Sequence, residues 1–196
     1  GEVRLIQGNF SDPGVIAQVP EVDCVVMFDV LLHQVRPHWN EVLAAYAPKT
    51  PRFIIYNQQF TASPTTVRLL DLGREAYFAN TPHDPEHPVY RNLFERMYED
   101  HPDHPGRMWR DVHHVWQWGI TDRDLLATME TLGYALTYYA NFGRFGDLPS
   151  FENHAFIFAT FFFSFSRFVM NWTLMLMRRV ATLSSPKFGR STLRTR

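Results

Sequence analysis

Asp23–His33, with the sequence DCVVMFDVLLH, decides the fold class of this chain. It is a nearly continuous apolar run that ends in polar side chains, and Pro51–Gln59 (PRFIIYNQQ) repeats the pattern. Such runs are typical of parallel strands that are buried on both faces of a sheet. Between them, WNEVLAAYA (39–47) carries its apolar residues at helical spacing, so the three segments together predict one βαβ unit.

Polar side chains follow both predicted strands. In open α/β sheets, ligands bind outside the carboxyl ends of the strands, so these positions are the first place to look for a functional site. The candidates are Phe28, Asp29, His33, Gln34, Asn57 and Gln58.

The last part of the chain predicts an antiparallel addition to the sheet. Thr121, with Asp124 three residues later, has the pattern of a helix start, and Gly133 is placed to end that helix. The strand-like segments YALTYYA (134–140) and HAFIFAT (154–160) follow. Because a loop joins them directly, without a crossover helix, we expect the two strands to be antiparallel.

Residues 61–117 interrupt this alternation of strands and helices. Proline and histidine cluster at 82–88 (PHDPEHP) and 101–107 (HPDHPGR), between modest helical patterns near 65–78, 89–98 and 107–117. We expect a helical insertion that covers the carboxyl edge of the sheet and shapes the substrate side.

Charge is distributed unevenly along the chain. The formal net charge is −1, but residues 161–196 hold seven of the 19 basic residues and none of the 20 acidic ones. The acidic body, 1–160, has no basic surface of the kind that binds nucleic acid. The apolar and then basic tail predicts either an unusual, partly disordered or non-native extension, a helix packed on the body or on a partner, or attachment to a membrane surface.

Cys24 is the only cysteine, which excludes a disulfide within the chain and favours a reducing, cytoplasmic setting. It lies inside an apolar run, where a buried thiol is favoured over a reactive one. The chain opens on a strand-like segment that ends at Gly8-Asn9-Phe10, with no signal peptide, so we expect that sequence is missing upstream. Composition predicts no particular oligomeric state.

The order of these segments resembles the carboxyl-terminal half of a class I S-adenosylmethionine-dependent methyltransferase. Three segments carry the resemblance: Gly8-Asn9-Phe10, Asp23–His33 and GITDRDLLATMETLGY at 119–134. It extends over about residues 3–160 and implies a partial Rossmann-like α/β fold. In that fold, parallel strands are flanked by helices, and the sheet ends in an antiparallel strand pair.

The resemblance also implies roles for individual residues. Asn9 would accept a hydrogen bond from the adenine amino group of S-adenosylmethionine, in place of the commoner Asp, and Phe10 would pack on the adenine ring. Phe28 and Asp29 would lie beside the methionine part of the cofactor, and His33 would be the general base. Local packing or hydrogen bonding at the strand ends is an open alternative for each of these residues.

The remaining candidates concern the substrate and metals. Gln34, Asn57, Gln58 and Trp116 are the predicted contacts of a small-molecule methyl acceptor, with packing as the alternative for each. The histidines of the insertion lack the spacing that would bring them to one ion, and no HExxH pattern is present, so no metal site is predicted.

The family's glycine-rich turn and the acidic residue that holds the ribose have no counterpart in this sequence. The sequence therefore predicts a truncated methyltransferase-like domain at 1–160, a fragment that transfers methyl groups as part of a longer chain. The alternative is a non-catalytic interaction or membrane-associated domain that keeps the fold without the cofactor half.

Overall fold

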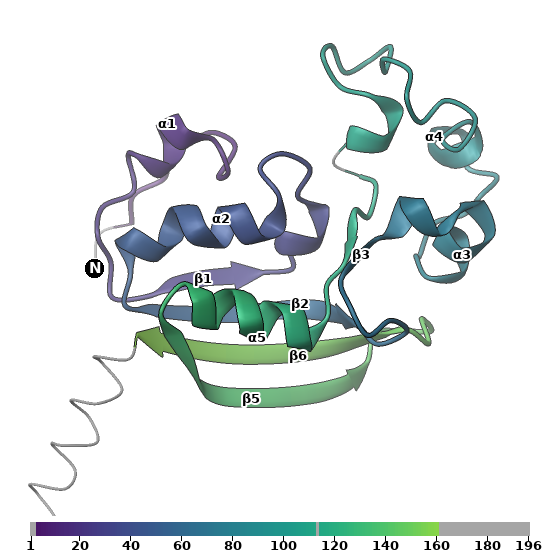
Figure 1. Cartoon of the computed structure of the whole chain (residues 1–196). Helices are drawn as coiled ribbons and strands as arrows, with labels where there is room; N and C mark the ends of the chain where they lie inside the picture. The colour runs from purple at the N-terminus through teal and green to yellow at the C-terminus, as the bar shows by residue number, and fades with distance from the viewer. Residues whose placement is uncertain (1–2, 113, 161–196) are drawn as a thin grey trace, which may run out of the picture. The chain divides into compact units, whose positions relative to one another are not determined.

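A four-stranded sheet is the centre of the protein in a computed structural model that describes residues 3–112 and 114–160 (Figure 1). Its order is β1-β2-β6-β5, with β1 and β2 parallel and the other neighbours antiparallel. The strands are β1 (Val25–Phe28), β2 (Arg52–Phe60), β5 (Tyr134–Arg144) and β6 (Phe151–Thr160). The predicted α/β fold, with a parallel pair and a terminal antiparallel pair, is confirmed.

Helices α2 (Trp39–Tyr46) and α5 (Asp122–Thr131) lie on the same face of this sheet (Figure 1). α2 joins the parallel strands β1 and β2, which is the predicted βαβ unit. Both helices contribute their apolar sides to one core, in which each fully buried large side chain stabilises the fold by about 1.5–3 kcal/mol. Its members include Met27, Trp39, Val42, Leu43, Phe53, Ile55, Leu125, Met129, Phe156 and Phe158. The short helix α1 (Pro13–Ile16) adds Ile16.

The ends of α5 are set by local chemistry, as predicted. The Thr121 hydroxyl accepts a hydrogen bond from the Asp124 backbone N–H at 3.3 Å, which satisfies one free donor of the first turn. Gly133 has φ of +86°, the left-handed conformation in which a helix commonly ends. Tyr134 follows at once, and its buried hydroxyl donates to the carbonyl oxygens of Ala47 and Thr50.

The prediction that the first strand is buried on both faces is wrong. Val26 and Phe28 of β1 are 50% and 63% exposed, whereas Met27 between them is buried in the core. Successive side chains of a strand point to opposite faces, and within the described residues helices cover only one of them (Figure 1). On the uncovered face, Phe28 makes an edge contact with Tyr56, with ring centroids 6.2 Å apart.

The predicted strand before Gly8 is not formed either. The described residues there have no regular structure, and Val3 and Leu5 are 84% and 91% exposed. A strand needs a neighbour for its backbone hydrogen bonds, and no described strand pairs with this segment.

The insertion is less helical than its sequence predicts. Near its start, β3 (Val67–Arg68) pairs antiparallel with β4 (Trp118–Gly119), which lies just after its end, and the short helices α3 (Arg74–Ala79) and α4 (Pro88–Arg91) lie between these strands. Prolines at the clusters 82–88 and 101–107 remove backbone donors, which prevents longer helices. The described residues also contain 3-10 helices at Leu31–His33, Ala47–Lys49, Leu69–Leu72 and Trp109–Asp111.

A second hydrophobic core attaches the insertion to the sheet. Insertion residues such as Tyr77, Leu93 and Trp116 pack in one cluster with Leu32, Phe60 and Phe151. Leu32 lies just after β1, Phe60 ends β2 and Phe151 begins β6, so the insertion sits at the carboxyl end of the parallel pair. Two arginine–aspartate pairs add polar links within it, Arg68–Asp111 and Arg110–Asp71, each at 2.7 Å.

No helix within 3–112 and 114–160 is long and apolar enough to cross a membrane. The predicted tail, 161–196, lies outside the described residues, and so does the interpretation of it as a membrane-surface or packed segment.

Candidate functional site

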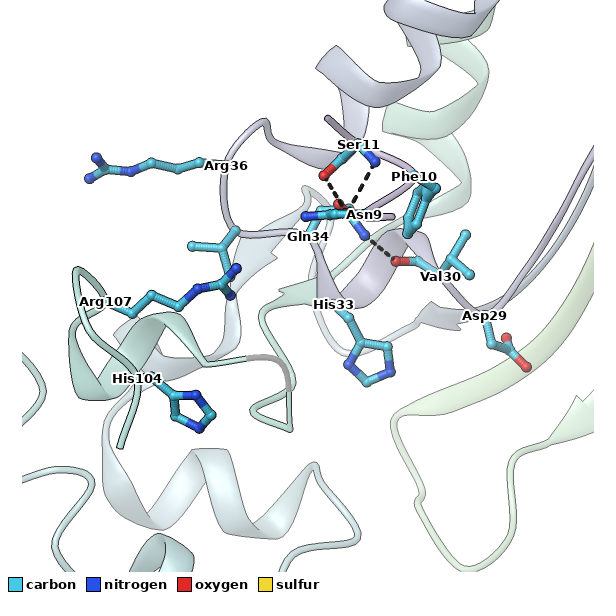
Figure 2. A pocket seen from close by; sticks show the side chains of 11 residues that line it. Asn9, Phe10, Ser11, Asp29, Val30, His33, Gln34, Arg36, His104 and Arg107 are labelled. Atoms are coloured by element: carbon cyan, nitrogen blue, oxygen red, sulfur yellow. Dashed lines mark hydrogen bonds between the residues drawn. The ribbon is translucent and has the colours of Figure 1, made fainter. Parts of the chain in front are cut away.

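A pocket of about 510 Å³ lies at the carboxyl end of β1 (Figure 2). Three parts of the chain form it: the turn before α1, the segment from Asp29 to Arg36, and the 101–107 loop of the insertion. Of the residues predicted for a site, the pocket brings together Asn9, Phe10, Asp29, His33 and Gln34.

Asp29 has the most unusual geometry of the pocket residues. Its φ is +50°, a left-handed conformation that is uncommon outside glycine and is enriched at functional sites. Its backbone N–H still donates to the Tyr56 carbonyl of β2 at 2.9 Å, so the turn leaves the sheet directly at this residue. Burial raises the pKa of the Asp29 carboxyl, and hydrogen bonds from Gln58 partly oppose that rise.

One oxygen of the Asp29 carboxyl, Oδ1, is buried and has no hydrogen-bond partner among the described residues. A buried acceptor without a donor costs about 1–3 kcal/mol, more if it is charged, so such atoms often mark ligand sites. This oxygen is therefore a candidate acceptor for a donor from outside the described residues.

His33 ends the 3-10 helix that follows β1, and the structure fixes this helix firmly. Leu31 and Leu32 are 1% and 0% exposed, and the Gln34 side-chain amide donates to the Val30 carbonyl at 2.9 Å. The indole N–H of Trp118 donates to the Gln34 carbonyl at 2.6 Å. His33 itself is half-buried and lines the pocket.

Asn9 and Phe10 line the pocket, but the Asn9 side-chain oxygen is already engaged. Asn9 Oδ1 accepts from the Ser11 backbone N–H at 3.1 Å and from the Ser11 hydroxyl at 2.9 Å. An adenine amino group would either share Asn9 Oδ1 with the two Ser11 donors or donate to it after the Ser11 hydroxyl rotates away. The Phe10 carbonyl accepts from the Tyr46 hydroxyl of α2 at 2.8 Å, which ties the turn to the core.

Four predicted site residues do not line the pocket. Phe28 lies on the uncovered face of the sheet, because it alternates with the core residue Met27. Asn57 and Gln58 are buried in β2, and Gln58 reaches the pocket only through its hydrogen bonds to Asp29. Trp116 is buried in the insertion core and contacts His33 edge-on, with ring centroids 6.3 Å apart, so it supports the histidine.

Sequence reasoning missed the basic side of the pocket. The structure adds Ser11, Arg36, His104 and Arg107 to its lining. The sequence predicts that the insertion covers this edge of the sheet, but it does not indicate that the HPDHPGR cluster is the part that brings His104 and Arg107 to the pocket. Only the packing of the insertion brings this loop to the pocket.

Within the described residues, no group of three His, Cys, Asp or Glu side chains is placed to hold a metal ion. Cys24 is half-buried, and burial raises the pKa of its thiol, which disfavours the reactive thiolate.

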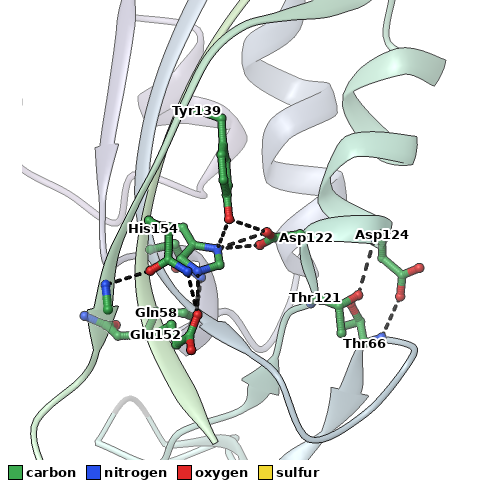
Figure 3. Close-up of polar contacts among 11 residues, drawn as sticks. Gln58, Thr66, Thr121, Asp122, Asp124, Tyr139, Glu152 and His154 are labelled. Carbon is green, nitrogen blue, oxygen red and sulfur yellow. Dashed lines mark hydrogen bonds and ion pairs between the residues drawn. The ribbon is translucent and has the colours of Figure 1, made fainter.

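A second polar cluster lies where α5 meets β5 and β6 (Figure 3). His154 is 4% exposed, and its Nδ1 lies 2.8 Å and 3.0 Å from the two carboxylate oxygens of Asp122. Its Nε2 lies 3.2 Å from Glu152 Oε2, and the Tyr139 hydroxyl lies 3.3 Å from Nδ1. Burial lowers the pKa of His154, but the hydrogen bonds and charges of Asp122 and Glu152 outweigh it and raise the pKa overall.

Neither the scan against protein-family models nor the search of curated proteins gives a match. The search of solved structures finds similar folds. One is the magnesium protoporphyrin IX methyltransferase ChlM from Synechocystis PCC 6803 with bound SAH, at 12% identity over 74% of this chain, with a TM-score of 0.39.

Two other solved structures are of the N-terminal domain of EvdMO1, one with SAH bound and one in the presence of SAH and D-fucose. They are 12% and 14% identical over 74% of this chain, with TM-scores of 0.40 and 0.39. The chain covers 48% to 50% of the three structures, about half of their length. The strand order and the pocket of this chain carry the proposal that follows.

Proposed function

We propose that this chain is part of an S-adenosylmethionine-dependent methyltransferase that acts on a small-molecule acceptor. The observation that carries the proposal is the pocket at the end of β1, which Asp29 and His33 both line, together with the buried Asp29 Oδ1 that has no hydrogen-bond partner among the described residues. The strand order, a parallel pair extended by an antiparallel pair, supports it, because it is the order that the sequence resemblance implies.

The residues present fit the cofactor in part. The cofactor supplies an electrophilic methyl group on a sulfonium. Asp29 Oδ1 would accept a hydrogen bond from its amino group, which would satisfy the buried oxygen. Phe10, half-buried beside Asn9, would offer its ring to the adenine. The groups that hold the ribose would come from sequence outside this chain.

In the proposed reaction, His33 removes the proton of the attacking hydroxyl or amine of the acceptor. A neutral imidazole near physiological pH is suited to this task. Gln58, which hydrogen-bonds Asp29, and Trp116, whose ring contacts His33, are positioning residues. Most of the rate enhancement in such a displacement comes from holding acceptor and methyl donor in line.

The test is calorimetric titration of SAH, the product left after methyl transfer, into the complete gene product that contains residues 1–196. We expect binding that Asp29→Asn weakens about tenfold, the loss of one charge-assisted hydrogen bond. Asp23→Asn is the matched control, because Asp23 is an exposed aspartate at the opposite end of β1.

His33→Asn should leave SAH binding within about twofold of the wild type, since the proposed role of His33 is toward the acceptor. Absence of SAH binding in the complete protein would refute the proposal and favour the non-catalytic interaction or membrane-associated domain. Equal losses in Asp29→Asn and Asp23→Asn would refute the role of Asp29.

A further inference from the structure

We propose that the methyl acceptor is anionic, a small molecule with a carboxylate or phosphate group, and that Arg107 binds this group. The inference rests on the proposed function. Its starting point is the division of charge in the pocket, where the Asp29 carboxylate lies at the sheet and the guanidinium of Arg107 comes from the insertion (Figure 2). Arg36, His33 and His104 also line the pocket, so its basic groups outnumber its single acid.

Arg107 is held in place by the folding of its own loop. The His101 backbone N–H donates to the Arg107 carbonyl at 2.8 Å, and the Arg107 N–H donates to the His104 carbonyl at 3.1 Å. The next turn is anchored by Trp109, which is 8% exposed and whose N–H donates to the Glu99 carbonyl at 3.0 Å. The backbone of this loop is therefore formed before any ligand arrives.

The guanidinium of Arg107 retains donors for a ligand. Its Nη1 lies 3.4 Å from the Asp111 backbone oxygen, and no carboxylate of the described residues lies within 4.0 Å of it. Asp100 and Asp111 border an adjoining pocket of about 250 Å³, but Asp111 is engaged by Arg68 at 2.7 Å. An arginine whose guanidinium is not engaged by a carboxylate binds carboxylate and phosphate oxygens through paired N–H donors.

The two ends of the pocket thus suit different groups. Asp29 repels an anion and favours the cationic amino group of the cofactor, whereas Arg107 favours an anion. An acceptor whose anionic group is held at Arg107 would occupy the same pocket that His33 lines. A neutral acceptor would form no ion pair with the guanidinium of Arg107.

The test compares benzoate with its neutral counterpart benzamide on the complete gene product, with and without saturating SAH. Binding is followed through the imidazole proton signals of His33 and His104, assigned with the His33→Asn and His104→Asn variants. We expect benzoate to bind at least tenfold more tightly than benzamide, and Arg107→Gln to remove most of this preference. Arg123→Gln, an exposed arginine of α5 outside the pocket, is the matched control.

Equal affinities for benzoate and benzamide, or an unchanged preference in Arg107→Gln, would overturn the inference. Displacement of benzoate by SAH would also overturn it, because the basic groups would then serve the carboxylate of the cofactor. If SAH fails to bind, the proposed methyl transfer fails, while the benzoate and benzamide titrations without SAH still decide whether the pocket selects anions.

Discussion

The Asp122–His154 pair allows a quantitative prediction for Asp122→Asn. The substitution keeps a polar side chain at the first position of α5 but removes the negative charge beside the imidazole. A hydrogen bond to a charged group contributes about 1.5–3 kcal/mol to the unfolding free energy. Because the Asp122 side chain is 32% exposed, solvent screening reduces this to about 1–2 kcal/mol.

The effect should depend on pH in a defined direction. The folded-state pKa of His154 is raised, so the stabilisation by its carboxylate partners is fully present below the ordinary value of 6.5. It is lost as the pH rises through the folded-state pKa. At pH 6, Asp122→Asn should lower the melting temperature by about 2–8 °C, since 1 kcal/mol corresponds to about 2–4 °C at this chain length.

Thermal unfolding followed by circular dichroism between pH 5.5 and 8.5 is the assay. Asp124→Asn is the matched control, because Asp124 lies in the same first turn but hydrogen-bonds the Thr66 backbone instead of His154. The wild type and Asp124→Asn should lose stability between pH 6.5 and 8.5, and Asp122→Asn should lose much less. Parallel curves for wild type and Asp122→Asn would refute the assignment of a charged, paired His154.

Three further predictions concern buried groups. Tyr134→Phe leaves two backbone carbonyls without their donor and should lower the unfolding free energy by about 1–3 kcal/mol in urea denaturation, with an unchanged slope. Gly119→Ala should lower the unfolding free energy by about 1–3 kcal/mol in the same assay, because the added Cβ would lie 2.7 Å from Phe60 Cγ. An unchanged urea midpoint would show that the Phe60 ring moves aside without cost. Burial, and then the charges of His114 and His33, lower the pKa of His83 to about 4, so the wild type should lose stability from pH 6.5 down to 4. His83→Gln should flatten that loss in acid-melting curves, and an unchanged acid slope would contradict a neutral, buried His83.

The sequence alone predicted those features that depend on interactions between residues close together in the chain. The apolar runs at Asp23–His33 and Pro51–Gln59 predicted the parallel pair, and the helical spacing between them predicted α2. The Thr121 cap and Gly133 predicted the ends of α5, because a capping hydroxyl and a left-handed glycine act within a few residues. The strand-end positions of Asp29, His33 and Gln34 followed from the same patterns.

The tertiary structure decided which parts of the chain pack against those residues. An apolar run does not indicate whether helices cover one face or both faces of its strand. The exposure of Val26 and Phe28 therefore depends on where the helices pack. Residues far apart in the sequence form the two polar sites: Arg107 of the insertion reaches the pocket of His33, and His154 of β6 meets Asp122 of α5. Such contacts depend on the closure of long loops around a common core, which no local pattern encodes.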